Sequence, residues 1–154
     1  MRKHLFRAVL TATGLAASCA AAWAQSPLTE AYAERKLNEY VRLWSSNRGI
    51  NPAAVSRYYA DQVIYYGKPM SQGAILRDKL QYASTWPERR YRIAPGTVSV
   101  ACDPYKTACR VSGVMEYDRR SFAGERAAGA ARLSLTLSRA SGSRVVQESA
   151  VFLR

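Results

Sequence analysis

The sequence predicts an α+β domain in which N-terminal helices cover one face of a curved antiparallel sheet. In the first half of the chain, apolar residues recur at helical period, and from residue 90 onward the period changes to two. Helices followed by a run of strands are typical of helices segregated to one face of an antiparallel sheet. The 154 residues fit one domain, and 48% hydrophobic with 22% charged residues exclude a disordered chain.

Residues 1–24 have the pattern of a secretory leader. A basic start is followed by an apolar run over 8–22, which is shorter than a bilayer span. Small residues at positions 22 and 24 predict cleavage between Ala24 and Gln25. Cys19 follows Ala-Ala-Ser, a poor match to a Leu-led lipobox, so we expect cleavage rather than lipidation. The sequence therefore predicts an exported protein, periplasmic or secreted, with no transmembrane segment after cleavage.

The expected mature domain covers residues 25–154. Loss of the leader removes three basic residues and no acid, so the formal charge falls from +12 to +9. The leader also contains His4, the only histidine, and one of the three cysteines. Only Cys102 and Cys109 then remain, in an oxidising compartment.

The first predicted element is a helix capped by Ser26, with Pro27 in its first turn, and ended by Asn47-Arg48-Gly49. Its apolar stripe at helical spacing comprises Leu37, Tyr40, Val41 and Trp44. This stripe is the expected contact with the sheet.

A second short helix is expected to open at Asn51-Pro52, with Val55, Tyr58 and Tyr59 on its buried edge. The β-branched and aromatic run 63–66, bounded by glycine and proline, predicts a strand. A third helix is capped by Ser71 and stopped by Trp86-Pro87. Its expected inner face consists of Ile75, Leu76, Leu80 and Ala83.

The remaining chain alternates between apolar and polar residues. Residues 132–138 give the clearest alternation, with leucines at 133, 135 and 137. We expect 121–131, which contains two glycines, to be a hairpin connection with ragged strand ends. The other predicted strands are 91–93, 98–102, 110–117 and 145–153.

This order of elements resembles the nuclear transport factor 2-like superfamily, in particular its SnoaL-like bacterial branch. The resemblance is carried by the long helix to Trp44, by Tyr58-Tyr59-Ala60-Asp61, by the strand ending 65–69, and by Gln147-Glu148-Ser149. It covers most of the mature chain and implies a cone-shaped domain with a cavity at the open end of its sheet. Proteins with this fold include isomerases, hydrolases, ligand binders and interaction domains, so the resemblance does not fix an activity. It also implies a homodimer formed through the open sheet face.

Cys102 and Cys109 flank a six-residue turn between two predicted strands. Opposed residues on paired strands are close enough for a disulfide. A metal site would need further ligands, which a mature chain without histidine does not offer. A redox pair usually has two intervening residues at a helix start. We therefore expect a structural disulfide, and neither a metal nor a cofactor.

The absence of histidine from the mature chain excludes Ser-His-Asp and Cys-His catalysis. An acid or base must then be a carboxylate, a tyrosine or a lysine. Asp61, before the first strand, and the strand residues Glu116 and Glu148 remain as candidates. In the ketosteroid isomerase-like members that the chain resembles, a pocket carboxylate acts as the base. Asp61 also fits an ordinary turn, the two glutamates also fit cross-strand pairs with arginine, and we assign no catalytic residue.

The aromatic residues of the helices and first strand are the best candidates for a ligand pocket, although each one taken separately fits the core better. They are Tyr40, Trp44, Tyr58, Tyr59, Tyr65 and Trp86.

The basic charge comes mainly from arginines spread along the chain, a pattern that also fits a solvated surface. A basic surface favours anionic partners, and the exported location excludes nucleic acid. The prediction is a non-catalytic envelope domain that binds a small ligand or a protein partner. The alternatives are a cofactor-free isomerase or hydrolase using a pocket carboxylate, and a basic adhesion module for anionic envelope surfaces.

Overall fold

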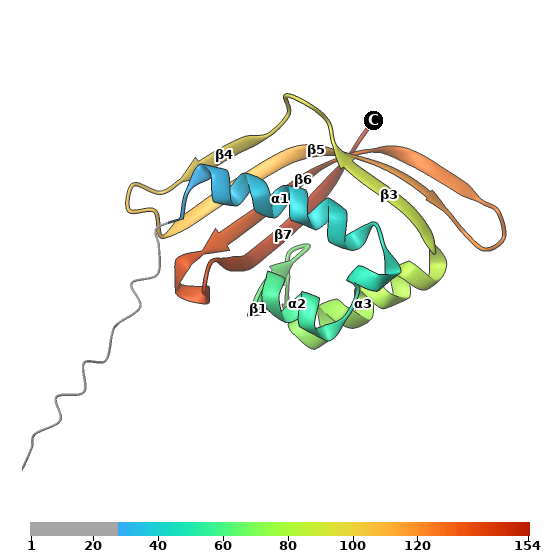
Figure 1. Cartoon of the computed structure of the whole chain (residues 1–154), viewed down its shortest axis with the longest axis horizontal. Coiled ribbons are helices and arrows are strands. Elements are labelled where there is room, and N and C mark those ends of the chain that lie inside the picture. The colour runs from blue at the N-terminus through green and yellow to red at the C-terminus, as the bar shows by residue number, and fades with distance from the viewer. Residues whose placement is uncertain (1–27) are drawn as a thin grey trace, which may run out of the picture.

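In the computed structural model, which describes residues 28–154, three helices lie against a seven-stranded curved sheet (Figure 1). The predicted leader, its cleavage after Ala24 and Cys19 lie outside the described residues. The helices are α1 (Glu30–Trp44), α2 (Pro52–Tyr58) and α3 (Gln72–Thr85), with 3-10 turns at Asn47–Gly49 and Arg139–Ser141. The strands are β1 (Tyr59–Tyr65), β2 (Lys68–Ser71), β3 (Glu88–Ile93), β4 (Ser99–Cys102), β5 (Ala108–Arg120), β6 (Arg126–Ser138) and β7 (Arg144–Leu153).

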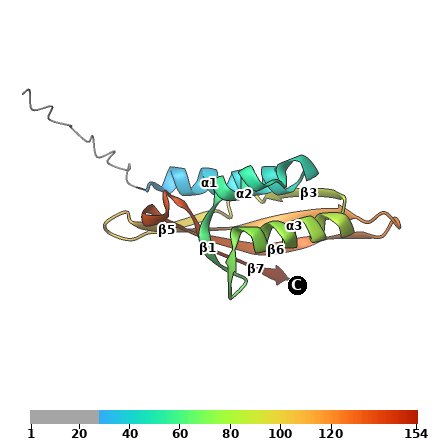
Figure 2. The ribbon, with the colours of Figure 1, turned by 90° about the horizontal axis from the view of Figure 1, so that it is seen from below.

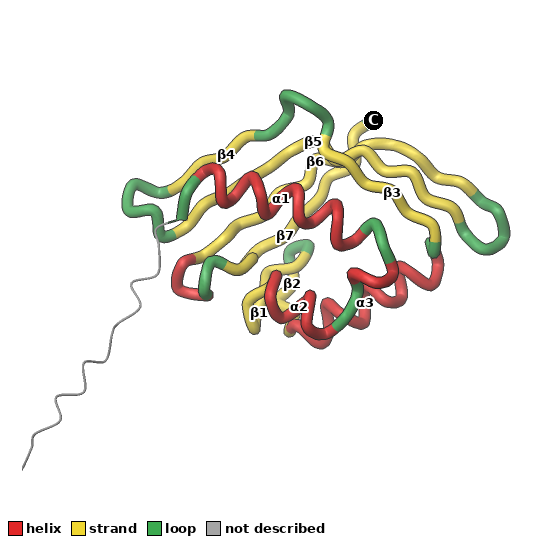
Figure 3. Tube along the Cα trace, in the orientation of Figure 1, coloured by secondary structure: helices red, strands yellow, loops and turns green. Residues whose placement is uncertain are grey.

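The sheet has the order β2-β1-β7-β6-β5-β3, and β4 pairs with the other end of β5. All neighbours are antiparallel except β1 and β7, which run parallel. The strands form one continuous curved layer (Figure 3), and α1 lies along one of its faces (Figure 2). The predicted α+β class, with a curved sheet covered by N-terminal helices, is confirmed.

Helix α1 packs through the predicted stripe: Leu37, Tyr40 and Trp44 are buried. Its approach to β5 is close, because a Cβ built on Gly113 would lie 3.0 Å from Leu37 Cδ2. The predicted cap residues Ser26 and Pro27 lie outside the described residues, and the helix begins later than predicted, at Glu30. The reason is local, since the Thr29 hydroxyl accepts a hydrogen bond from the Tyr32 amide at 3.1 Å and caps the helix.

Three further boundaries and faces differ from the prediction. Tyr59 is buried as expected but opens β1 instead of closing the second helix. The 121–131 segment is mostly strand, because β6 starts at Arg126 and its ladder with β5 continues to the turn. On α3, Leu80 is 48% exposed and its neighbour Lys79 is buried between Ile75 and Ala83.

Cys102 and Cys109 form the predicted disulfide. They are opposed in the β4–β5 ladder, with their Cα atoms 4.0 Å apart. The bond closes the turn between β4 and β5. It lies at the start of β5, whereas β3 pairs with the other end of that strand.

Candidate functional site

A cavity of about 560 Å³ lies between the helices and the inner face of the sheet. Its lining comes from α1, α3, the β1–β2 hairpin and strands β3, β5, β6 and β7. Most of the wall is apolar or aromatic, and a few charged side chains reach it, which is the usual make-up of a small-molecule site. The aromatic lining residues are Tyr40, Trp44, Tyr65, Tyr66, Tyr82, Tyr91, Tyr117 and Phe152.

Three of the six predicted pocket residues, Tyr40, Trp44 and Tyr65, line this cavity. Tyr58 and Tyr59 are fully buried behind them, where Tyr59 stacks on Trp44 at 6.1 Å between ring centroids. These two residues belong to the core that supports the wall.

Trp86, the sixth predicted pocket residue, is half-buried and is not among the lining residues. Its ring lies against a lining residue, with the Arg119 guanidinium carbon 4.4 Å from the ring centroid. Trp86 therefore orients a cavity side chain instead of touching the cavity.

A buried charge cluster joins the cavity wall to the core. It consists of the lining residues Tyr40 and Lys79 with Glu148 and Tyr59 behind them, and is called here the Glu148 cluster. Glu148 is 0% exposed, and its two carboxylate oxygens accept hydrogen bonds from the hydroxyls of Tyr40 (2.8 Å) and Tyr59. The Lys79 ammonium lies 3.6 Å from Glu148 Oε1. Burial and the neighbouring carboxylate hold the pKa of both tyrosines well above the ordinary value, so the hydroxyls stay protonated.

Lys79 reaches this carboxylate through aromatic rings. Its Nζ lies 4.6 Å from the Trp44 ring centroid and 5.0 Å from that of Tyr40, distances typical of cation–π contacts. Burial lowers the pKa of Lys79, while Glu148 acts in the opposite direction. Sequence reasoning missed this lysine because a charged residue on a helix face is normally assigned to solvent.

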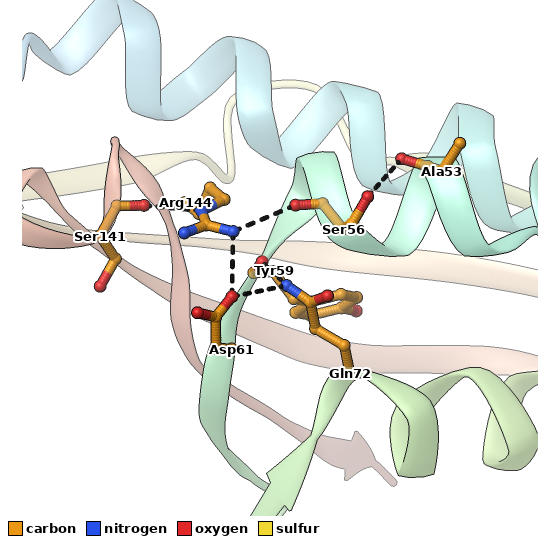
Figure 4. Close-up of polar contacts among 7 residues, drawn as sticks. All are labelled: Ala53, Ser56, Tyr59, Asp61, Gln72, Ser141 and Arg144. Carbon is orange, nitrogen blue, oxygen red and sulfur yellow. Dashed lines mark hydrogen bonds and ion pairs between the residues drawn. The ribbon is translucent and has the colours of Figure 1, made fainter.

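The three candidate carboxylates lie in different places. The Asp61 side chain is 86% exposed and lies beside Arg144 and Gln72 (Figure 4). It is not among the residues that line the cavity. Glu116 forms an ion pair with Arg92 across β3 and β5, as the cross-strand alternative predicted. Only Glu148 points inward, and it is enclosed by the cluster described above.

The cavity nevertheless has one carboxylate in its wall. Asp78, on α3, lines it, and its Oδ2 accepts a hydrogen bond of 3.0 Å from the Tyr65 hydroxyl. In the sequence, flanking Arg77 and Lys79 made Asp78 resemble an ordinary surface residue. Helix geometry turns Lys79 inward and brings Asp78 to the cavity mouth.

Two arginines that face each other on adjacent strands also line the cavity. Arg89 on β3 and Arg119 on β5 are partners in the ladder, and both line the cavity. Arg89 is 5% exposed and donates from Nε to the Trp44 carbonyl (3.1 Å) and from Nη1 to the Trp86 carbonyl (2.5 Å). Arg119 donates from Nη1 to the Tyr82 hydroxyl and lies over the rings of Trp86 and Tyr117. We call these two residues the arginine pair.

Two classes of site find no support in the part of the chain that the structure describes. No group of three or more carboxylate, cysteine or histidine side chains there could hold a metal ion. Within residues 28–154, every helix is too short or too polar to cross a lipid bilayer.

Comparison with known proteins identifies the fold through structure alone. No protein-family model matches the sequence, and no curated protein is recognisably similar to it. A nuclear transport factor 2-like superfamily protein from Salmonella enterica serovar Typhimurium is similar in structure (TM-score 0.63, 10% identity, 78% of this chain and 87% of that chain). So is a candidate scytalone dehydratase from Novosphingobium aromaticivorans (0.61, 11%, 79% and 81%).

A third similar structure is a candidate calcium/calmodulin-dependent protein kinase II association domain from Xanthomonas campestris (TM-score 0.62, 14% identity, 84% of this chain and 94% of that chain). These names span enzymes and association domains, so the likeness does not choose among functions. Together the neighbours support the resemblance noted in the sequence, and the chain has the nuclear transport factor 2-like fold.

Proposed function

We propose that this chain is an exported domain that binds a small, largely apolar ligand in its cavity and performs no chemistry on it. The observation that carries the proposal is the cavity itself, about 560 Å³ with an aromatic wall and few polar groups. This volume falls in the range of ligand sites in proteins. The disulfide and the leader-like residues 1–24 support export.

The Glu148 cluster supports binding over catalysis. A general base must come within hydrogen-bond reach of the substrate proton. Glu148 is fully buried, both of its oxygens accept tyrosine hydroxyls, and Lys79 neutralises its charge. Such a carboxylate is suited to holding the wall in place.

Asp78 favours a second candidate function, a cofactor-free isomerase or hydrolase. It is a carboxylate at the cavity with a phenol hydroxyl 3.0 Å away, a pair able to accept and return a proton. The candidate scytalone dehydratase among the structural neighbours fits this alternative. An enzyme of this kind should catalyse α-deuterium exchange of a small cyclic ketone such as 2-tetralone, and Asp78→Asn should abolish that exchange without abolishing ligand binding.

The surface arginines do not favour the third function, adhesion to anionic surfaces. Arg92, Arg120 and Arg126 each have a carboxylate within 4.0 Å, and Arg126 binds Asp118 through two hydrogen bonds. Paired charges of this kind present less net positive field to a membrane or polymer than the sequence count indicates.

Ligand binding can be tested with N-phenyl-1-naphthylamine, a neutral dye that fluoresces in apolar sites. We expect saturable binding at one site per chain. Ala150→Phe places a ring into the cavity wall and should weaken binding about tenfold or more. The matched control is Ala128→Phe, which makes the same change at an exposed position of β6.

Circular dichroism and a thermal unfolding curve would establish that both variants are folded. Absence of saturable dye binding to the wild-type protein, or equal binding by folded Ala150→Phe, would overturn the proposal.

A further inference from the structure

The arginine pair brings two positive charges together on one face of the sheet. Arg89 and Arg119 are directly opposed in the β3–β5 ladder, so their side chains leave the sheet on the same side. Like charges directly opposite each other on adjacent strands destabilise a sheet. Their position therefore calls for a compensating negative charge.

No side chain in residues 28–154 supplies that charge. Neither arginine forms an ion pair in this part of the chain, whereas Arg92, Arg120, Arg126 and Arg144 all do. The other charged residues at the cavity are Lys68, Asp78 and Lys79. Asp78 accepts from Tyr65, and Lys79 is paired with Glu148.

Three residues of the cavity wall carry buried hydrogen-bond donors without acceptors. Arg89 Nη2, Arg119 Nε and Trp44 Nε1 are buried and have no hydrogen-bond partner in the described chain. All three atoms are donors, and all three residues line the cavity. Buried polar groups are nearly always satisfied and an unsatisfied one is costly, so a ligand acceptor that reached these donors would relieve that cost.

The guanidinium groups are held ready for such a ligand. Arg89 is fixed by the carbonyls of Trp44 and Trp86. Arg119 is held between the rings of Trp86 (4.4 Å) and Tyr117 (5.2 Å) and by the Tyr82 hydroxyl. Little side-chain freedom remains to be lost on binding, which favours affinity.

From these observations we infer that the cavity ligand carries one carboxylate, which Arg89 and Arg119 bind, while its flat apolar body lies against the aromatic wall. A planar carboxylate matches the fork of a guanidinium and supplies acceptors for the unpaired donors. The inference rests on the proposed ligand-binding function and names the chemical class of the ligand.

The test compares 2-naphthoate with 2-naphthamide, a neutral probe of nearly the same shape. Each is titrated calorimetrically into the full domain at pH 7.5 and used to displace N-phenyl-1-naphthylamine. We expect the acid to bind at least about tenfold more tightly than the amide, since a hydrogen bond to a charged group contributes more than a neutral one. This comparison needs no variant.

Variants then locate the carboxylate. Arg119→Met should weaken naphthoate binding by about 10- to 100-fold and leave naphthamide binding within about threefold. Arg119→Lys keeps the charge but not the fork and should recover only part of the loss. The matched control is Arg120→Met, the same substitution at the neighbouring exposed residue, which should bind both probes like the wild-type protein. Arg89 is a poorer choice because it also ties down two carbonyl groups.

The possible failures are distinguishable. If both probes displace the dye with equal affinity, or if folded Arg119→Met binds naphthoate like the wild-type protein, the carboxylate assignment is overturned and the ligand-binding function stands. If the dye binds but neither probe displaces it, the carboxylate assignment also falls. If the dye itself does not bind to the wild-type protein, both proposals fall together.

Discussion

Replacing Glu148 with Gln tests whether the buried charge cluster holds the domain together. At 3.6 Å and an effective dielectric constant of about 20, the attraction between Lys79 and Glu148 is about 4–5 kcal/mol. The substitution leaves the Lys79 ammonium buried among aromatic rings without its counter-ion. In the wild-type protein two tyrosine hydroxyls donate to the carboxylate, and in the variant one of them faces an amide NH2 group, which is itself a donor.

The loss of unfolding free energy has an upper limit, because Lys79 can give up its proton. For a lysine of ordinary pKa, deprotonation at pH 7 costs about 4–5 kcal/mol. Breaking one partner of a buried ion pair typically costs about 3–5 kcal/mol. We therefore expect Glu148→Gln to lower the free energy of unfolding by about 3–5 kcal/mol, measured by urea unfolding with tryptophan fluorescence.

Glu116→Gln is the matched control. It makes the same change in a strand glutamate, but the ion pair of Glu116 with Arg92 is exposed, so the loss should stay below about 1 kcal/mol. Equally small losses of stability in Glu148→Gln and Glu116→Gln would show that the buried ion pair does not hold the domain together.

The pH dependence gives a second readout of the same substitution. Burial lowers the pKa of Lys79, and removing the carboxylate that opposes this effect lowers it further. Between the folded and unfolded pKa values of a lysine, the folded state binds fewer protons, so stability rises with pH. The deficit of Glu148→Gln should therefore shrink as the pH rises from the Lys79 pKa of the variant to that of the wild-type protein, by up to about 1.4 kcal/mol per pH unit. A deficit that stays constant or grows over this range would contradict a buried lysine as its cause.

Three further predictions concern other parts of the fold. Burial raises the pKa of Tyr40 and Tyr59, so the free energy of unfolding should fall above pH 10 by about 1.4 kcal/mol per pH unit for each tyrosine. Ionisation of the two phenols, followed by absorbance at 295 nm, should coincide with unfolding. Phenolate formation in the folded protein would argue against this. Reducing the Cys102–Cys109 disulfide should cost roughly 2.5 kcal/mol in urea unfolding, and denatured, unreduced exported protein should contain no titratable thiol in these positions. Asp61→Asn should change the free energy of unfolding by less than about 1 kcal/mol and leave dye binding unchanged, because the carboxylate is exposed. A large loss of dye binding would show that Asp61 takes part in ligand binding.

Much of the fold could be predicted because it depends on local patterns. The stripe of Leu37, Tyr40 and Trp44 is buried as a helical period requires, and the alternating leucines of β6 are all fully buried. The cysteine spacing predicted a hairpin disulfide, and the structure contains it. The class of fold, its main elements and part of the aromatic wall are therefore properties of the sequence read segment by segment.

The orientation of Glu148 could not be predicted, because β7 does not keep a regular two-residue period in its pairing with β6. Leu137 pairs with Val145 and Thr136 with Gln147, so β7 contains a bulge at Val146. The bulge breaks the two-residue period, and both Val145 and Glu148 point inward. Counting alternate residues therefore could not separate this glutamate from Glu116.

Local patterns accounted for the buried stripe of α1 and for most of the strands, because each depends on residues a few positions apart. Composition set the small number of chemical groups available. The packing of distant segments set which charges lie close together. It placed Lys79 beside a carboxylate 69 positions away and set Arg89 opposite Arg119 through the register of β3 and β5. The physical reason is that burial and electrostatic interaction act through distance in space, and the sheet brings together residues that the chain keeps apart.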